Sequence, residues 1–129
     1  MVTVVIPVHN RKHFTRDCLA SLKAQTRQPD GIIIVDDGST DGTGEMLQYD
    51  FPEVTVLSGD GNLFWTAAIN KGIKYALDHG SRFILTLNND TVASPDFIEK
   101  MMMAATEYPN ALVGALDIDA TTGKPYYGG

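Results

Sequence analysis

Three short polar clusters hold the residues of this 129-residue chain that are best suited to chemistry. They are His9-Asn10, Asp36-Asp37 and Asn88-Asn89-Asp90, and each comes directly after an apolar run. Carboxylate and amide oxygens accept hydrogen bonds from the N–H and O–H groups of a base or a sugar, and they also ligate hard cations such as Mg²⁺. The clusters therefore predict a site for a polar ligand, a cation or both.

The apolar runs before the clusters predict the elements that position them. Residues 2–8, 32–35 and 83–87 are short and rich in aliphatic residues, which is typical of strands buried on both faces, and residues 54–57 give a further strand. Helical patterns separate these runs. The alternation predicts one Rossmann-like α/β domain over residues 1–129, with a mostly parallel sheet and helices on both faces in three α/β/α layers. Parallel strands would bring the three clusters to one edge of the sheet.

Local signals mark where the helices begin and which face they bury. We expect Asn10 to cap the first helix, and Ser39, Thr40 or Asp41 to cap the second, which starts near Gly42. Residues 65–77 show the clearest helical period, and the predicted buried face is Trp65, Ala68, Ile69, Gly72, Ile73, Ala76 and Leu77. Trp65 has two interpretations, because its indole could pack in the core or stack on a ligand ring.

Each polar cluster also has a purely structural interpretation. Asp, Asn and Gly follow strands in many α/β proteins because they form turns and caps. A single histidine in a loop, such as His9, is more often a hydrogen-bonding residue than a catalyst, so we expect it to line the site. Asp90 is the metal candidate, with an Asx-turn as the alternative. The coincidence of three clusters favours a functional site over three unrelated turns.

Composition excludes several classes of protein. The net charge is −6 and the ten Lys and Arg residues are scattered, which argues against binding to nucleic acid. The single cysteine, Cys18, cannot form an internal disulfide. No apolar run approaches the roughly 18 residues of a membrane helix, so we expect no membrane insertion by this chain. The chain has neither a Gly-Lys-Ser/Thr phosphate loop nor a Gly-x-Ser-x-Gly motif.

Several segments together resemble the beginning of family 2 glycosyltransferases, which have the GT-A fold. These segments are residues 4–11, 25–26, 34–43, 62–63, 68–72, 87–90 and 94–97, so the similarity covers nearly the whole chain. Two positions depart from the common family pattern. Asn88 stands where the first Asp of the Asp-x-Asp motif is usual, as in rhamnosyl- or galactofuranosyl-transferring members. Phe64 and Trp65 stand where many members have small residues.

The resemblance implies a site for a nucleoside-diphosphate sugar, linked to UDP or dTDP. Pro7, Val8, His9 and Asn10 would line the base and ribose, and Asp37 would contact the base. Asp90 would bind Mg²⁺ or Mn²⁺ on the diphosphate, with Asn88 as a weaker helper. The other expected nucleotide-sugar contacts are Asp36, Gly38, Asn62, Asn70 and Asn89.

The function implied is inverting transfer of a sugar to a saccharide or lipid-linked acceptor, in surface polysaccharide biosynthesis. We expect a cytoplasmic protein, with peripheral association of the full protein at the inner face of the membrane as an open alternative. The family takes its catalytic base from well beyond the Asp-x-Asp strand, so we expect the base beyond Gly129 and a chain that lacks its acceptor half and is inactive in transfer. Asp117 and Asp119, the downstream carboxylates, are expected in turns or the sugar pocket.

Two alternatives from other classes stay open. The first is a module that binds a nucleotide or nucleotide-sugar without transferring anything. The second is a receiver-like regulatory domain, which has a similar acidic pair. That class needs a lysine after a late strand, and this chain has Asp117 and Asp119 there.

Overall fold

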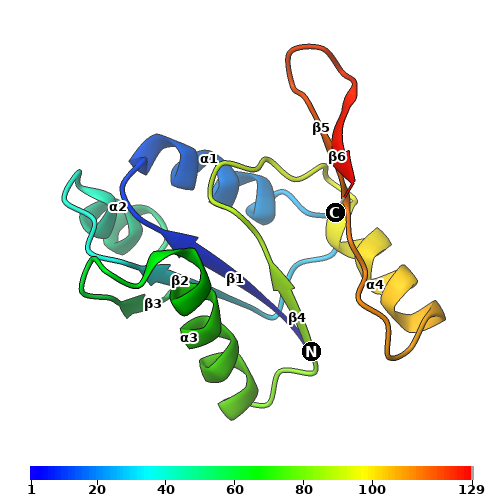
Figure 1. The fold of residues 1–129 in the computed structure, drawn as a ribbon, viewed down its shortest axis with the longest axis horizontal. Coiled ribbons are helices and arrows are strands. Elements are labelled where there is room, and N and C mark those ends of the chain that lie inside the picture. Colours follow the sequence, from blue (N-terminus) through cyan, green and yellow to red (C-terminus); the bar gives the residue numbers. More distant parts are fainter. Residues whose placement is uncertain (129) are drawn as a thin grey trace.

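The computed structural model describes the backbone of residues 1–128 and the side chains of residues 1–125. Strands and helices alternate along most of this length (Figure 1). The elements are β1 (Val2–Val8), α1 (Lys12–Lys23), β2 (Gly31–Asp36), α2 (Thr43–Asp50), β3 (Thr55–Ser58), α3 (Phe64–Asp78), β4 (Phe83–Thr86), α4 (Phe97–Glu107), β5 (Leu116–Ile118) and β6 (Pro125–Gly128).

A parallel four-stranded sheet forms the centre of the molecule, in the order β3-β2-β1-β4. Within β1, Val4 pairs with Ile32 of β2 and with Leu85 of β4. All seven residues of β1 are buried, because the strand is central and covered on both faces. This arrangement confirms the predicted parallel α/β sheet. The two C-terminal strands, β5 and β6, form a separate antiparallel hairpin (Figure 1).

The period of two along β1 divides the core into two layers. Val4, Ile6 and Val8 belong to the cluster that contains buried residues of α1, α2 and α4. Val5 belongs to the cluster with α3 on the other face. At Gly72 of α3, an added Cβ would lie 2.3 Å from Val5 Cγ1, so this glycine allows the helix to approach the sheet closely. The three-layer α/β/α prediction is confirmed.

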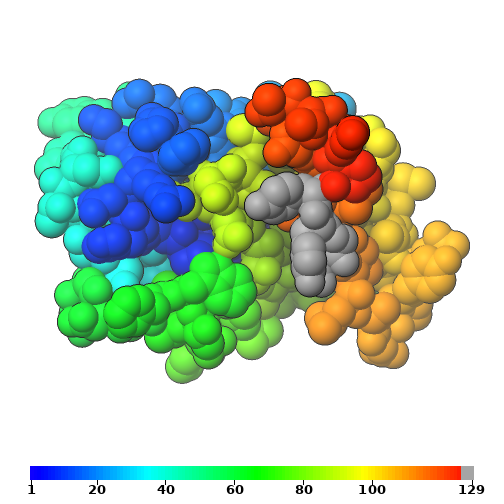
Figure 2. Space-filling view, turned by 45° about the horizontal axis from the view of Figure 1, so that its top comes forward, coloured from blue at the N-terminus to red at the C-terminus, as the bar shows by residue number. Residues whose placement is uncertain are grey.

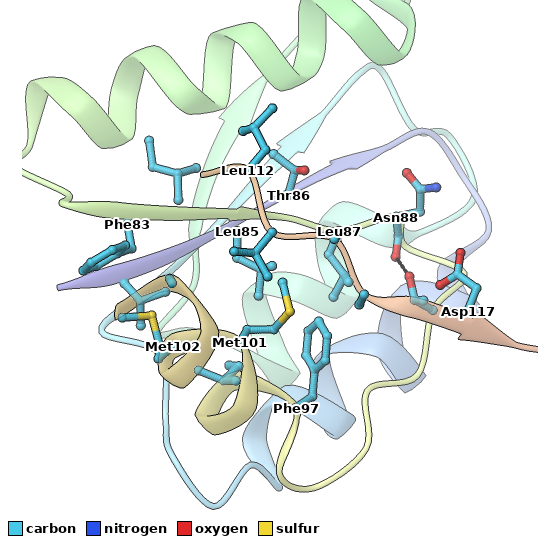
Figure 3. A pocket seen from close by; sticks show the side chains of 18 of the residues that line it. Phe83, Leu85, Thr86, Leu87, Asn88, Phe97, Met101, Met102, Leu112 and Asp117 are labelled. Atoms are coloured by element: carbon cyan, nitrogen blue, oxygen red, sulfur yellow. Dashed lines mark hydrogen bonds between the residues drawn. The ribbon is translucent and has the colours of Figure 1, made fainter. Parts of the chain in front are cut away.

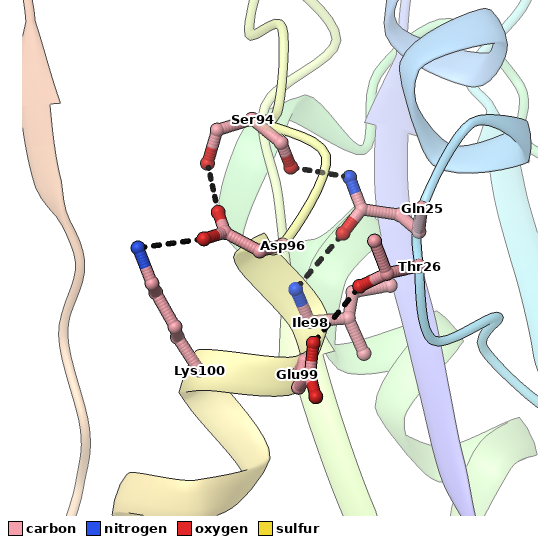
Figure 4. Close-up of polar contacts among 7 residues, drawn as sticks. All are labelled: Gln25, Thr26, Ser94, Asp96, Ile98, Glu99 and Lys100. Carbon is pink, nitrogen blue, oxygen red and sulfur yellow. Dashed lines mark hydrogen bonds and ion pairs between the residues drawn. The ribbon is translucent and has the colours of Figure 1, made fainter.

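The segment after β4 is attached to the end of α1 by Gln25, which is buried (Figure 4). Its side-chain Nε2 donates to the Ser94 carbonyl at 2.6 Å, and its Oε1 accepts the Ile98 backbone N–H at 2.9 Å. Thr26 adds a backbone bond to the Pro95 carbonyl and a hydroxyl bond to Glu99. The residues that follow the third polar cluster are therefore fixed against α1.

The beginning of α1 corrects one prediction. Asn10 is not the cap, because Asn10 and Arg11 both have left-handed backbones, with φ of 57° and 58°, and the helix begins at Lys12. The Lys12 N–H donates to Asp41 Oδ2 at 2.9 Å. A side chain 29 residues away in the sequence therefore satisfies the first turn of the helix.

The predicted buried face of α3 is correct in its middle and wrong at its ends. Ala68, Ile69, Gly72 and Ala76 are buried, whereas Trp65 and Leu77 are 54% and 59% exposed. The predicted turn near Gly123 is present, with φ of 70° at this glycine between β5 and β6. Among the described residues, no helix is both long enough and apolar enough to cross a membrane.

Candidate functional site

The three polar clusters meet at the carboxyl edge of the parallel sheet. They follow β2, β1 and β4, which are adjacent in the strand order, so one surface carries all three. A hollow of about 500 Å³ opens there, which we call the polar cavity. Figure 2 shows it between the blue N-terminal segment, the green start of α3 and the yellow-green segment after β4. It is lined by Pro7, Val8, His9, Arg11, Asp37, Gly61, Phe64, Trp65, Ala68, Asn88, Asn89 and Asp90.

The polar cavity gathers most of the predicted site residues but not all of them. The predicted residues that line it come from the end of β1 and from each polar cluster, namely Pro7, Val8, His9, Asp37, Asn88, Asn89 and Asp90. The predicted contacts that do not line it are Asn10, Asp36, Gly38, Asn62 and Asn70. Asn62 and Asn70 are both exposed, Asn62 in the loop before α3 and Asn70 on that helix. Their roles as nucleotide-sugar contacts stay predictions.

Asn10 and Asp36 shape the loops behind the cavity. The Asn10 backbone N–H donates to Ser39 Oγ at 2.7 Å, and its side-chain Oδ1 accepts the Thr40 N–H at 2.8 Å. Asp36 Oδ1 accepts the Ser39 N–H at 3.1 Å, which is an Asx-type turn. Gly38 has φ of 71°, and a Cβ there would lie 3.0 Å from the backbone of Gly61. The Asn10 contacts join the loop after β1 to the loop after β2, and the close approach of Gly38 to Gly61 joins the loop after β2 to the loop before α3.

Asp37 organises the loop that leads into α3. Its Oδ1 accepts the Gly61 N–H at 2.8 Å, and its Oδ2 accepts the N–H groups of Leu63 at 2.9 Å and Phe64 at 3.1 Å. The residue is only 4% exposed. A carboxylate oxygen has two lone pairs, so Oδ1 keeps one for a ligand. The predicted contact with a base stays a prediction, and the structure adds a role in loop architecture.

His9 lies on the cavity wall with its ring tied to the same loop. Its Nδ1 donates to the Asp37 carbonyl oxygen at 2.6 Å, while the residue as a whole is exposed. The hydrogen bond makes Nδ1 the protonated nitrogen of a neutral ring and leaves Nε2 as an acceptor. Asn10 Nδ2 donates to this Nε2 at 3.4 Å, so both ring nitrogens have neighbouring partners, and the lining role of His9 stays a prediction.

The third cluster divides into one structural amide and two groups that face the cavity. Asn89 Nδ2 donates to the hydroxyl of Thr15, a buried residue of α1, at 3.1 Å. Asn88 and Asp90 are exposed, and Asn88 Oδ1 accepts the indole N–H of Trp65 at 2.7 Å. Within residues 1–125, the Asp90 carboxylate takes part in no hydrogen bond or ion pair.

The donor set around Asp90 suits a cation that is shared with a phosphate ligand. In the described part of the chain, no group of three or more His, Cys, Asp or Glu side chains could hold a metal ion without help. Mg²⁺ is usually bound by one or two carboxylates together with substrate phosphates and waters. The free carboxylate of Asp90 and the amide oxygen of Asn88 fit that pattern. These two ligands are too few to hold a metal ion without the oxygens of a bound phosphate.

Cys18 of α1 lies beneath this cluster. Its thiol donates to the Asn88 carbonyl oxygen at 3.8 Å. Burial and the nearby negative charge of Asp90 raise the pKa of the thiol to about 12. The group is therefore protonated at neutral pH and supports the loop as a weak donor.

Sequence reasoning missed several residues that line the polar cavity. Arg11 is the one guanidinium among them, and it is exposed. Its place directly after His9-Asn10 was a signal that a basic group accompanies the first cluster. Phe64 was singled out with Trp65 as a departure from the family pattern, and both line the cavity. Gly61 and Ala68 gave no comparable signal, because Gly61 lies in a loop held by Asp37 and Ala68 is a buried residue of α3.

A second hollow, which we call the β4 cavity, measures about 580 Å³ and runs along the unpaired edge of β4. Its walls are mainly apolar, and Figure 3 shows Phe97 and Met101 of α4 beside Leu85 and Leu87. Asp117 and Asn88 also line it. Trp65, Asn88 and Asp90 line both cavities, so these residues form the boundary between them.

The sequence profile of Glycosyl transferase family 2 matches residues 3–127. This chain belongs to that family. Among curated members, the chain is 33% identical over 106 residues to an N-acetylglucosaminyl-diphospho-decaprenol L-rhamnosyltransferase of Mycobacterium tuberculosis, covering 76% of this chain and 34% of the relative. It is 29% identical over 112 residues to glycosyltransferase GlyA of Streptococcus pneumoniae, covering 83% of this chain and 15% of the relative. The family 2 chain thus spans about a third of these relatives or less.

Solved structures show the same fold. S. aureus TarS 1–349 in complex with UDP matches with a TM-score of 0.70 at 21% identity, over 82% of this chain and 32% of that one. The mannosyltransferase PcManGT from Pyrobaculum calidifontis, in complex with GDP-Man and Mn²⁺, matches with a TM-score of 0.65 at 20% identity, over 92% of this chain and 35% of that one. The fold of this family 2 chain is therefore the GT-A fold that the sequence predicted.

Proposed function

We propose that this chain is the donor-binding part of an inverting, metal-dependent glycosyltransferase that uses a UDP- or dTDP-linked sugar. The observation that carries the proposal is the polar cavity, which is bordered by the guanidinium of Arg11 and the free carboxylate of Asp90. The chain that holds this cavity belongs to family 2. Structural neighbours bound to UDP, UDP-GlcNAc and GDP-Man support a nucleotide-sugar ligand.

Each wall of the polar cavity has a part in this function. His9 and the remaining lone pair of Asp37 Oδ1 would face the base, and Arg11 would meet the diphosphate. Asp90, with Asn88, would hold Mg²⁺ or Mn²⁺ against the phosphate oxygens. A cation at that position neutralises the negative charge that grows on the leaving nucleotide.

Transfer itself needs more than the donor. In an inverting reaction, the acceptor hydroxyl oxygen attacks the anomeric carbon, the bond to the diphosphate breaks, and a base takes the hydroxyl proton. We propose that this base lies outside residues 1–129, and that the acceptor is a saccharide or lipid-linked glycan of surface polysaccharide biosynthesis in the cytoplasm. General base catalysis contributes ~10²–10⁴-fold, and holding the two reactants together contributes more. The chain alone should therefore bind donor and transfer no sugar.

Calorimetric titration with UDP and dTDP tests the donor site. We expect binding to strengthen by about tenfold, or about 1.4 kcal/mol, when Mg²⁺ or Mn²⁺ replaces a chelator. Asp90→Asn should remove most of this gain while leaving the affinity in chelator unchanged, because only the metal contact is lost. Equal affinity with and without metal in the parent chain would contradict the metal site.

A transfer assay separates the enzyme from a module that only binds. The chain and a version extended to the length of its relatives are incubated with labelled nucleotide-sugars, metal and saccharide or lipid-linked acceptors. We expect glycoside formation by the extended protein only, whereas a binding module would form none in either version. Glycoside formation by the short chain would place the base within it, and Asp117, which lines the β4 cavity, and Asp119 would be the first residues to replace.

A further inference from the structure

One hydrogen bond joins two residues of the boundary between the polar cavity and the β4 cavity. The indole Nε1 of Trp65, at the start of α3, donates to the side-chain Oδ1 of Asn88, after β4, at 2.7 Å. Among residues 1–125 the indole is the only group that donates to this oxygen. Trp65 is 54% exposed, so burial in the core does not explain where its ring lies.

A strained turn directs Trp65 to this place. Phe64, the residue before it, has φ of 56°, a left-handed conformation that is unfavourable for an aromatic residue. The Asp37 carboxylate accepts the N–H groups of Leu63 and Phe64 and so holds the turn. Such strain persists only where surrounding contacts enforce it, and it gathers at functional sites. The buried carboxylate of Asp37 therefore fixes the direction in which α3 begins.

We propose that Trp65 is a positioning residue that orients Asn88 as a ligand for the divalent cation of a nucleoside diphosphate, an inference that rests on the proposed function. The amide oxygen has two lone pairs, so it accepts the indole N–H with one and keeps the other for a cation beside Asp90. Without the indole, the exposed Asn88 side chain would rotate freely. Outer hydrogen-bonding partners of metal ligands typically change metal affinity by about 10–100-fold.

A double-mutant cycle tests whether Trp65 acts through Asn88. UDP binding is measured by calorimetry, in Mg²⁺ and in chelator, for the parent, Trp65→Phe, Asn88→Ala and the double variant. We expect Trp65→Phe to reduce the metal-dependent gain several-fold, and the double variant to match Asn88→Ala, because each change removes the same contact. Additive losses, or an equal loss of affinity in chelator, would show that the ring contacts the nucleotide directly and would overturn the proposal.

Tyr49→Phe is the matched control, since it also removes one polar donor from an exposed aromatic ring, but on α2 away from both cavities. It should leave the metal-dependent gain unchanged. If the parent chain shows no such gain, the proposed metal site fails and this inference fails with it. If the parent shows the gain and Trp65→Phe keeps it, the inference alone fails.

Fluorescence supplies a readout that needs no ligand, because Trp65 is the only tryptophan of the chain. Asn88→Ala should shift the emission of the ligand-free protein, since the indole loses its acceptor. Adding Mg²⁺ with UDP should change the emission of the parent and leave that of Asn88→Ala less affected. Identical emission spectra for the two ligand-free proteins would show that the bond is absent in solution and would overturn the proposal.

Discussion

The two sides of the polar cavity are built in different ways. On the β1 and β2 side, carboxylates accept backbone N–H groups, namely Asp36 from Ser39, Asp37 from Leu63 and Asp41 from Lys12. On the β4 side, the Asp90 carboxylate has no such partner within residues 1–125. A carboxylate that is hydrogen-bonded to backbone N–H groups makes its wall of the cavity rigid, whereas a carboxylate without such bonds can bind a cation. The comparison suggests that the first side is preformed for its ligand and that the second is completed by it.

Replacing Asp37 and Asp90 by their amides should give the largest contrast in the free energy of unfolding between the two sides. Asp37→Asn puts an NH₂ group against backbone donors, so we expect the free energy of unfolding to fall by about 3 kcal/mol, since hydrogen bonds to charged groups are worth 1.5–3 kcal/mol each. Asp90→Asn should change it by less than about 0.5 kcal/mol, as exposed substitutions usually do. Urea denaturation of the two variants and the parent measures both values.

Asp36→Asn is a control on the same turn, because its side chain accepts a single backbone N–H. It should lower the free energy of unfolding by about 1 kcal/mol, a value between those expected for Asp37→Asn and Asp90→Asn. If Asp37→Asn proved as stable as Asp90→Asn, the two sides of the cavity would not differ in the way described, and Asp37 would be free to serve a ligand with both oxygens.

Glycines at the contact between the loop after β2 and the loop before α3 should give the next largest effect. Gly38 and Gly61 both have positive φ, but an added Cβ would lie 3.0 Å from backbone at Gly38 and would meet nothing within 4 Å at Gly61. We expect Gly38→Ala to lower the free energy of unfolding by about 2 kcal/mol and Gly61→Ala by about 1 kcal/mol. Both substitutions strain the left-handed backbone, but only the Cβ at Gly38 also meets a neighbouring backbone. Thermal or urea unfolding of the pair checks this, and equal losses would mean that the loops separate easily.

The parts of the fold that follow from local sequence were predictable. Ile32, Ile33 and Ile34 are typical of a buried strand, and the parallel β-α repeat requires the residues after each strand to share an edge. The gathering of His9, Asp37 and Asp90 around one cavity was therefore within reach of the sequence.

The parts that depend on distant contacts were not predictable. Asn is a residue type that often caps helices, yet at the start of α1 it is Asp41, from the loop after β2, that accepts the Lys12 N–H. Phe64 takes a left-handed backbone against its local preference because Asp37 enforces it. Trp65 continues the apolar period of α3, but it lies beside the cavity and is largely exposed. Each of these residues is placed by a partner far away in the sequence.

A smaller effect than those of Asp37 and Gly38 is expected at Asp41, which ties the start of α1 to the start of α2 on the rigid side. Its Oδ2 accepts the Lys12 N–H, and its Oδ1 accepts the hydroxyl and N–H of Thr43. The Thr43 hydroxyl, followed by the backbone donors, lowers the pKa of the Asp41 carboxyl below its usual value. We expect Asp41→Asn to lower the free energy of unfolding at pH 7 by about 1 kcal/mol, as the loss of a helix cap does.

The acid dependence of that difference tests its cause. Because the pKa is lowered in the folded state, the stabilisation is complete above the unfolded pKa of about 3.9 and is lost as the pH falls through the folded value. The parent and Asp41→Asn should therefore converge in stability below about pH 4, measured by urea denaturation at several pH values. Thr43→Val removes the main cause of the lowered pKa, so less stability should be lost on acidification, and the loss should be complete at a higher pH. A difference between parent and Asp41→Asn that stays constant down to pH 2 would show that the cap does not depend on charge. The rigid side of the cavity would then rest on neutral hydrogen bonds and packing, and Asp37 would be its one structural carboxylate with a large effect.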